Sequence, residues 1–472
     1  MTRTIEIDPV TRIEGHAKVF IDLDDRGVVE NAGMIVNELR GFERILVGMD
    51  ASQMPLITAR ICGVCPTSHH LVASKALDMV TNATPPAAGA LLRELMFMGH
   101  YIHSHALSLF VLQGPDLVLG LDASPKERNV VGVVKAAPDV ATKALRLRTV
   151  GQKLNEMIGG RGVHPISSVA GGMSYSPDNA DVKKIRHLCD EAMTLVEQLA
   201  PLAKSLLLRQ LDSQKALLDS WHGHGWYMGT VKDGALNFYD GQLAVADDAG
   251  KPVMRFESPE YDQHLHEATL KWSYMKPVTF HINDVDQSYR VGPLARVKCA
   301  DRIETPLASA ELDQMNKAFG ASNATILYTY ARLIELIYAC ENAKLLAADK
   351  RLQDIGRTPT QIQAGRAVAH VEAPRGTLIH DYDIDDDGIV RSANLLVATQ
   401  QNYNGINESV TQAAQSHVEG KDDNGLLNAV EFAIRCYDPC LSCATHAVGQ
   451  MPLDIQVRQH GAVIRSVRRV SL

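Results

Sequence analysis

The sequence contains no apolar run of the roughly 18–20 residues that a bilayer-spanning helix requires. Its first residues, MTRTIEIDPV, lack the long apolar segment of a secretory signal. Basic residues form no dominant tract and the formal net charge is −8, which gives little electrostatic support for nucleic acid or an anionic membrane as a partner. These absences predict a cytoplasmic protein with no transmembrane segment and no nucleic-acid partner.

Cysteine is scarce, and no dinucleotide-binding fingerprint is present. Because no strand–GxGxxG–helix unit occurs, any nicotinamide cofactor must bind elsewhere. Four of the eight cysteines form two CxxC pairs, which in a reducing compartment are more often metal ligands or redox groups than disulfides. The other four have no second cysteine at a spacing typical of metal ligands. We expect them to be buried core residues: Cys189, Cys299, Cys340 and Cys436.

Hydrophobic periodicity divides the chain into strand-like and helical stretches. The composition, 46% hydrophobic and 22% charged, is ordinary for a globular protein with a large core. The strand-like stretches are 4–40 and 368–399, and the helical ones are 66–80, 89–112, 180–219 and 305–350. The pattern predicts an α+β fold: a single large domain, mostly helical, with a central helix bundle and small antiparallel sheets at its periphery.

Two short stretches at opposite ends of the chain carry the paired cysteines. ARICGVCPTSHH holds Cys62 and Cys65, and YDPCLSCATHAVGQMPL holds Cys440 and Cys443. Four thiolates from two such turns suit a soft or borderline metal ion. Pro66 fits a first helical position and DPC resembles a capped helix start, so we expect each pair at a helix N-terminus, where the dipole favours thiolates.

A structural zinc site is the main alternative for these sulfurs. Zinc ribbons usually place their two pairs ~15–20 residues apart, whereas Cys65 and Cys440 are 375 apart. Closing the longer loop costs only about 2–3 kcal/mol more, so spacing alone does not exclude zinc. Glu14, Arg375 and Asp438 are candidates for proton handling and electrostatic stabilisation, although each alone is more often a surface charge or an ordinary ion pair. A thioredoxin-like dithiol is disfavoured because neither pair lies in a βαβ context.

Four blocks of the sequence occur in the order found in one enzyme family. DPVTRIEGH, RICGVCPTSH, APRG and DPCLSCATH resemble the signature blocks of the large, catalytic subunit of nickel–iron hydrogenases, and SYMKP with VGPLARV supports this across nearly the whole chain. The last block is most similar to the cytoplasmic NAD-reducing (bidirectional) branch. The related quinone-site subunit of respiratory NADH dehydrogenase lacks the ligand cysteines, all of which are present here. The remaining rival is a non-catalytic scaffold subunit with a structural zinc site made by the four cysteines.

The resemblance implies a nickel ion bound by all four thiolates and reversible cleavage of H2 to protons and electrons. Cys62 and Cys440 would be terminal ligands, while Cys65 and Cys443 would bridge to an iron that carries carbon monoxide and cyanide. The chain has no further set of cluster-binding cysteines, so an iron–sulfur small subunit is the expected partner. In the NAD-linked branch, flavin- and NAD-binding diaphorase subunits complete the electron path.

The family motifs also imply roles for groups beside the metals. Cys440 would accept a proton and pass it to Glu14, whose carboxyl can turn outward to a water path. Arg375 would lie over the metals, fixing the cyanide-bearing iron and polarising the pocket. Asp438 and Asp116 would hold that guanidinium by accepting charge-assisted hydrogen bonds.

Further positions match groups that bind the cofactors in this family. Thr399 matches a donor to a cyanide nitrogen, although Ala398 stands where the family usually has proline. Glu43 and His446 match positions that bind a hard cation, usually Mg²⁺, for which a surface acid and a core histidine are the plain alternatives. His69 is either a donor to a thiolate or a packing residue.

Residues 447–472, read alone, form a terminal hairpin of two strands around a glycine turn. In this family the precursor is cut just after the histidine of the last block, once nickel has been inserted. We therefore expect a maturation endopeptidase to cleave between His446 and Ala447. Residues 1–446 would then be the hydrogenase domain, and 447–472 an extension that is removed.

Overall fold

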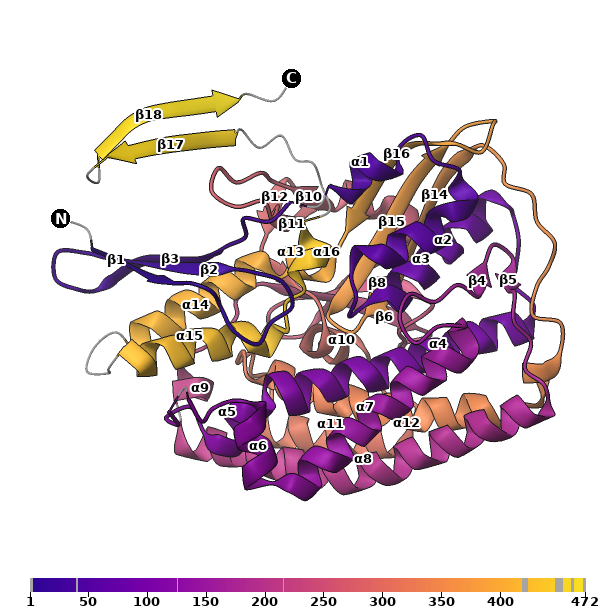
Figure 1. The fold of residues 1–472 in the computed structure, drawn as a ribbon, viewed down its shortest axis with the longest axis horizontal. Helices are drawn as coiled ribbons and strands as arrows, with labels where there is room; N and C mark the ends of the chain where they lie inside the picture. The colour runs from indigo at the N-terminus through magenta and orange to yellow at the C-terminus, as the bar shows by residue number, and fades with distance from the viewer. Residues whose placement is uncertain are drawn as a thin grey trace.

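A layer of four long helices makes up the body of the protein, at the bottom of Figure 1. They are α4 (Ala87–Ala106), α7 (Pro138–Gly159), α8 (Asn179–Ser213) and α12 (Leu327–Ala348). α4 and α8 each pack against both α7 and α12, so the four helices enclose one core. The computed structural model describes residues 3–39, 41–124, 126–214, 216–417, 423–445, 453–459 and 462–469.

Local sequence signals set the ends of these helices. α7 begins with Pro138, whose missing N–H is not needed at a first helical position, and ends before Gly160 in a left-handed conformation. α8 begins after Asp178, whose side chain accepts a hydrogen bond from the Asp181 N–H. α12 is buried around nearly its whole circumference, which explains why its sequence is apolar on most sides. The predicted central bundle is confirmed.

α4 continues directly into a turn of π-helix, Leu107–Leu112. Among the described residues, the run Ala87–Leu112 is the one helix that is long and apolar enough to cross a membrane by length and composition. However, 72% of its most apolar window is buried inside the protein. Because α4 lies against α7 and α12, its place in the core accounts for its apolar sequence.

Two antiparallel sheets of three strands lie above this layer (Figure 1). The first packs through its third strand on α14 (Tyr403–His417), which lies along α15 (Asp423–Tyr437). The second packs on α3 (Pro66–Val80), the helix that follows the first cysteine pair. The strands are β1 (Arg3–Ile7), β2 (Lys18–Leu23) and β3 (Val29–Ile35) in the first, and β14 (Gly365–Ala373), β15 (Gly376–Ile384) and β16 (Val390–Leu396) in the second.

Two further sheets are formed by the chain between residues 226 and 290. One joins β13 (Tyr289–Arg290), β6 (Trp226–Lys232), β8 (Gln242–Ala246) and β9 (Pro252–Phe256), with β7 (Ala235–Leu236) beside β6. The other joins β10 (Leu265–Glu267), β11 (Val278–Ile282) and β12 (Val285–Gln287). The predicted small antiparallel sheets are confirmed, with one addition: β13 runs parallel to β6. The long connection between these two strands returns the chain in the same direction.

Short elements complete the described chain. The predicted terminal hairpin is present as the antiparallel pair β17 (Leu453–Gln459) and β18 (Ala462–Arg469). The observed fold is therefore the predicted α+β class, with helices dominant. The remaining α-helices and strands are α1 (Phe42–Leu46), α2 (Met54–Thr58), α5 (Gly114–Leu119), α6 (Val130–Ala136), β4 (Ser168–Val169), β5 (Gly172–Met173), α9 (Ala216–Asp219), α10 (Pro293–Cys299), α11 (Pro306–Phe319), α13 (Ala398–Gln401) and α16 (Leu441–Ala444).

Glycines allow α4 and α7 to approach each other closely. A Cβ atom added at Gly151 would lie 2.5 Å from the Gly99 carbonyl oxygen and 2.5 Å from the His103 backbone nitrogen. One added at Gly99 would lie 2.8 Å from the Leu154 Cβ. These distances are far below van der Waals contact, and the neighbours are mostly rigid helix backbone.

We expect Gly151→Ala to lower the free energy of unfolding by about 1–3 kcal/mol, because the extra methyl group must push the two helices apart. The measurement is thermal or denaturant unfolding of the variant beside the wild type. Gly162→Ala is the matched control, since its Cβ would meet its nearest neighbour at an ordinary 3.5 Å. Equal stability of the two variants would contradict this account of the helix contact.

Candidate metal centre

The four cysteines of the two CxxC pairs meet in one buried pocket. Cys62 Sγ lies 3.3 Å from Cys440 Sγ, and Cys65 Sγ lies 2.9 Å from Cys443 Sγ. The separation is 4.0 Å between the sulfurs of Cys65 and Cys440, and 3.1 Å between those of Cys440 and Cys443. Each residue is at most 5% exposed. The predicted convergence of the two pairs is confirmed.

The four sulfurs lie close enough together to bind one metal centre, and most of their separations are shorter than those around a bound ion. A tetrahedral ion with sulfur at about 2.3 Å has sulfur–sulfur edges of about 3.8 Å, and the four Sγ atoms lie within 4.8 Å of one another. Burial raises the pKa of the Cys440 and Cys443 thiols. A bound cation is therefore needed for all four sulfurs to be ionised together.

Each cysteine pair lies at the beginning of a helix, as predicted. Cys65 is the residue before α3, whose first residue is Pro66. Cys440 is the residue before the four-residue helix α16. In the first pair, the Val64 N–H also donates to Cys62 Sγ over 3.2 Å. The Val64 N–H thus favours negative charge on Cys62, and the N-terminus of α3 favours negative charge beside it.

The Glu14 carboxyl reaches the centre from the N-terminal segment. Cys440 Sγ donates to Glu14 Oε2 over 3.2 Å, and the Ser442 N–H donates to the same oxygen over 2.9 Å. Gly15 has a φ of +84°, and a Cβ there would lie 2.8 Å from the Leu441 Cβ, so the crossing of the two segments requires glycine. Because Glu14 is half-buried, it connects a buried sulfur with the surface of this chain.

Arg375 enters the pocket from the turn between β14 and β15. Its Nη2 donates to Asp438 over 3.1 Å, and its Nη1 donates to Ser104 Oγ of α4 over 3.4 Å. Both charged residues are at most 4% exposed. Burial alone would lower the pKa of Arg375, but the Asp438 carboxylate and the nearby sulfurs outweigh it and raise that pKa. The guanidinium therefore stays charged beside the sulfurs.

A second buried guanidinium, which the sequence did not predict, holds this turn in place. Arg296, in α10, donates to the carbonyl oxygens of Ala373 and Pro374 over 2.9 and 3.1 Å. It also bonds to Glu335 at 2.5 and 2.7 Å and to Glu372 at 2.9 Å, and all three charged residues are fully buried. Such a network rigidifies its surroundings. The block VGPLARV contains Arg296. Its partners lie 39 and 76 residues away in sequence, so no local spacing could indicate these ion pairs.

Thr399 lies in the first turn of α13 and lines the same pocket. Its Oγ1 accepts a hydrogen bond from the Cys440 N–H over 2.8 Å, and the residue is 3% exposed. The hydroxyl can thus donate its own hydrogen toward a group in the pocket. Ala398, where the family motif has proline, begins α13 and also lines the pocket, so this departure leaves Thr399 beside the sulfurs.

His69 connects the sulfurs to a row of buried side chains. Its Nε2 lies 3.4 Å from Cys443 Sγ, and its Nδ1 lies 3.0 Å from His380 Nε2. His380 Nδ1 in turn lies 2.6 Å from the Tyr382 hydroxyl. The contact favours the role of His69 as a donor to a thiolate. His380 and Tyr382 were not predicted. They occupy alternate positions on β15, and such a pattern indicates only that two residues share one face of a strand.

Asp116 lies among three other guanidiniums, which corrects its predicted pairing with Arg375. Arg12 donates to its two oxygens over 2.7 and 2.9 Å, Arg128 donates over 2.5 Å, and Arg435 donates over 3.1 Å. These donors surround a carboxylate that is fully buried at the start of α5. The sequence correctly predicted that Asp116 pairs with an arginine side chain. It could not indicate which arginine this would be.

The Asp116 cluster joins the two ends of the chain beside the centre. Arg12 comes two residues before Glu14, and Arg435 comes five residues before Cys440. One buried carboxylate therefore fastens both the segment that carries the acid and the helix, α15, that leads to the second cysteine pair. Asp116 is in this respect a positioning residue.

The predicted hard-cation site lies only partly within the described residues. Glu43 is half-buried in the first turn of α1, and its Oε1 accepts a hydrogen bond from the Leu395 N–H over 2.8 Å. His446 and Ala447 lie outside the described residues. The second Mg²⁺ ligand and the cleavage point therefore stay predictions.

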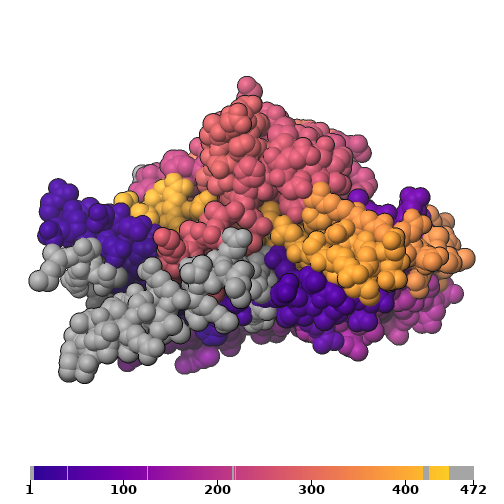
Figure 2. Space-filling model, turned by 90° about the horizontal axis from the view of Figure 1, so that it is seen from above, coloured from indigo at the N-terminus to yellow at the C-terminus, as the bar shows by residue number. Residues whose placement is uncertain are grey.

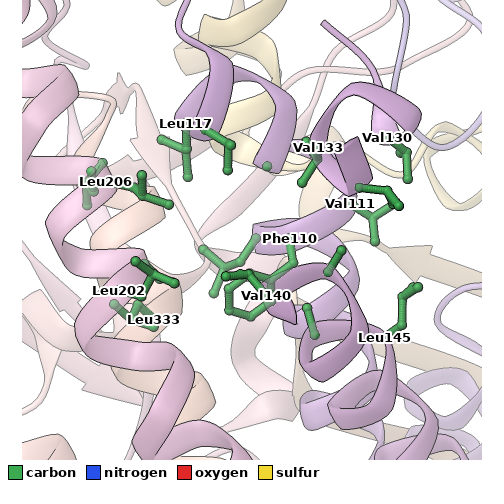
Figure 3. A pocket seen from close by; sticks show the side chains of 18 of the residues that line it. Phe110, Val111, Leu117, Val130, Val133, Val140, Leu145, Leu202, Leu206 and Leu333 are labelled. Carbon is green, nitrogen blue, oxygen red and sulfur yellow. The ribbon is translucent and has the colours of Figure 1, made fainter. Parts of the chain in front are cut away.

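A second pocket lies in the helical layer and is almost entirely aliphatic. Figure 3 shows Leu117, Val133, Val140 and Leu202 around it, contributed by α5, α6, α7 and α8. Thr329 is the single polar side chain in its lining. Because this pocket offers no titratable group, its lining cannot supply acid–base chemistry.

Comparison with known proteins agrees with this geometry. The family model described as "Nickel-dependent hydrogenase" matches residues 40–128 and 209–446, and a model described as "HoxL-like" matches residues 4–39. A vhu subunit of the F420-non-reducing hydrogenase of Methanococcus voltae is 41% identical over 87% of this chain and 98% of its own length. The NAD-reducing hydrogenase HoxS subunit beta of Cupriavidus necator is 37% identical over 97% of each chain.

Solved structures share the fold. An NAD⁺-reducing [NiFe]-hydrogenase in the H2-reduced state superposes with a TM-score of 0.89 and 37% identity, over 94% of this chain and 100% of that chain. The Ni-Fe-Se hydrogenase of D. vulgaris Hildenborough, 24% identical over 94% of this chain and 100% of its own, shares the fold with a TM-score of 0.77. The predicted resemblance is confirmed. The chain belongs to the nickel-dependent hydrogenases as a large, catalytic subunit, and is an oxidoreductase that acts on H2.

Proposed function

We propose that this chain cleaves dihydrogen heterolytically and reversibly at a nickel–iron centre. The observation that carries the proposal is the meeting of four buried sulfurs with a carboxyl group bonded to one of them. Cys62 and Cys440 would bind nickel alone, while Cys65 and Cys443 would also bind an iron with carbon monoxide and cyanide ligands. Dihydrogen is a very weak acid, so its cleavage requires a Lewis acid. When bound, the metal pair supplies this Lewis acidity and the redox chemistry.

Cys440 and Glu14 form the first part of the proposed proton path. A proton released from H2 passes to Cys440 Sγ and then over 3.2 Å to Glu14 Oε2. Ser442 holds the carboxyl through its N–H and its hydroxyl, so these bonds must break when the carboxyl turns outward. Both protons of H2 would leave by this path through Cys440 and Glu14, and the bound metal pair would take up the two electrons.

Arg375 and Thr399 suit the role of fixing anionic ligands on the iron. Both line the pocket beside Cys65 and Cys443, the proposed bridging cysteines. The Arg375 guanidinium supplies buried positive charge, and the Thr399 hydroxyl supplies a neutral donor. Donors of these two kinds match the nitrogen ends of cyanide groups.

The electrons require a second protein chain. The cysteines outside the centre are all buried and do not gather with one another into a metal-binding group in the described structure. The direct partner that we propose is therefore an iron–sulfur small subunit. Flavin- and NAD-binding diaphorase subunits would follow, with NAD(P) as acceptor, which the likeness to the NAD-reducing relatives supports. An NAD-linked acceptor implies a cytoplasmic location.

A hard cation completes the proposal. Mg²⁺ prefers carboxylate oxygens and water, and the Glu43 carboxylate is of this type. With His446 it would bind the ion close to the second cysteine block. The ion would then hold the end of the mature chain against α1.

Metal analysis separates this proposal from a scaffold protein with a structural zinc site. We expect one nickel per copy of this chain in the purified complex and one iron per nickel beyond the iron of the partner's clusters, with infrared bands of metal-bound carbon monoxide and cyanide. Cys443→Ala should remove both metals and H2 oxidation, because it deletes a bridging ligand. The control Cys189→Ala, in α8 and outside the centre, should retain both. Zinc alone in active material would overturn the proposal.

Glu14→Gln tests the proton path. We expect H2 oxidation to fall by about 10²-fold or more, because an amide fills the same space but cannot relay the proton. Nickel and iron contents should be unchanged, and exchange between D2 and water protons should fall with the rate. Glu38→Gln, which alters a partly exposed acid paired with His16 on the same segment, should keep full activity. Normal turnover by Glu14→Gln would exclude this path.

Mass spectrometry tests the removal of residues 447–472. We expect active, nickel-loaded protein to end at His446, and protein from nickel-starved cells to end at Leu472. One observation supports the cut: the family model's match stops at residue 446. Leu472 still attached to active, nickel-loaded protein would contradict the proposal.

A further inference from the structure

The small sheet β10–β11–β12 carries three metal-ligand side chains, one on each strand. His281 on β11 pairs directly with Asp286 on β12. His266 on β10 pairs with Thr279, two residues before His281. Since alternate residues of a strand share a face, His266, His281 and Asp286 all lie on the same side of the sheet.

The three side chains converge on one point. His281 Nδ1 lies 2.9 Å from Asp286 Oδ1, and His266 Nδ1 lies 3.3 Å from the same oxygen. The two imidazole rings stack with centroids 4.4 Å apart and planes 27° apart. All three ligand atoms lie within 4.8 Å of one another. A tetrahedral ion with nitrogen and oxygen ligands at about 2.0–2.1 Å has edges of about 3.3 Å, close to these separations.

We propose that His266, His281 and Asp286 form a second metal site, separate from the sulfur pocket, for a borderline divalent ion such as Zn²⁺ or Ni²⁺. Two imidazoles and one carboxylate are a ligand set that these ions prefer, whereas Mg²⁺ and Ca²⁺ prefer sets made mainly of oxygen ligands. Three protein ligands leave at least one position for water or for a group from outside the chain.

The sheet presents this site to solvent in a fixed form. The side chains of His266, His281 and Asp286 are 45%, 30% and 52% exposed, and Figure 2 shows the salmon-coloured part of the chain, which includes this sheet, at the surface. On the opposite face of β11, Val278 and Phe280 are fully buried. The backbone that carries the ligands is therefore anchored, and an ion can bind without refolding the strands.

A plain ion pair is the competing explanation, in which Asp286 only accepts hydrogen bonds from the two imidazoles. One histidine satisfies that role elsewhere on this chain, where the exposed His224 lies 3.6 Å from Glu408. A second imidazole, stacked on the first and 3.3 Å from the same carboxylate oxygen, is not needed for such a pair. It does add the third ligand that a metal ion needs.

Zinc titration of the assembled holoenzyme, after EDTA has removed loosely bound ions, tests the site. We expect one Zn²⁺ per chain beyond the metals of the sulfur pocket, with no displacement by excess Mg²⁺. His266→Gln and His281→Gln should each weaken this binding at least tenfold, and both should keep wild-type H2 oxidation. The control His224→Gln, which removes an exposed histidine outside the trio, should bind zinc as the wild type does.

X-ray absorption at the zinc edge gives a readout that does not depend on a variant. We expect only nitrogen and oxygen in the first shell of the bound zinc, with the scattering of two imidazoles. Sulfur in that shell would place the zinc on cysteine and overturn the proposal. Zinc binding by His281→Gln with the stoichiometry and affinity of the wild type would overturn it as well.

Discussion

Two pairs of sulfur atoms from opposite ends of the chain must reach one pocket before any chemistry can take place there. Cys65 and Cys440 are 375 residues apart in sequence, yet their sulfurs are 4.0 Å apart. The entropy cost of such a loop rises only logarithmically with its length, so a well-packed protein can bear it. The helical layer and the sheets between the pairs supply the packing. The metal therefore binds to a folded body and does not organise a small module around itself.

Buried ion pairs fix the position of the reactive groups within that body. Arg296 holds the turn from which Arg375 projects, and Asp116 ties the segment of Glu14 to the helix that leads to Cys440. A buried pair is costly to break, on the order of 3–5 kcal/mol, because the remaining charge is left without a partner. Such networks keep the carboxyl and the guanidinium in register with the sulfurs even though these groups come from distant parts of the sequence.

The sequence was informative wherever chemistry depends on local spacing. The CxxC pairs, the helix starting at Pro66 and the apolar periodicity of the long helices are local patterns, and each predicted the observed element. Contacts between distant residues were less accessible. Asp116 contacts Arg12, Arg128 and Arg435 because of how α5 packs. No sequence motif indicates these partners. The surface trio on β10–β12 depends on strand register, which sequence alone leaves open.

Anomalous diffraction from crystals of the active complex, collected at the nickel and iron edges, tests the central claim most directly. The account predicts a nickel peak within bonding distance of all four sulfurs of the two pairs. It also predicts an iron peak beside it, on the side of Cys65 and Cys443. A lone zinc peak in that pocket, or nickel bound elsewhere in active protein, would contradict it.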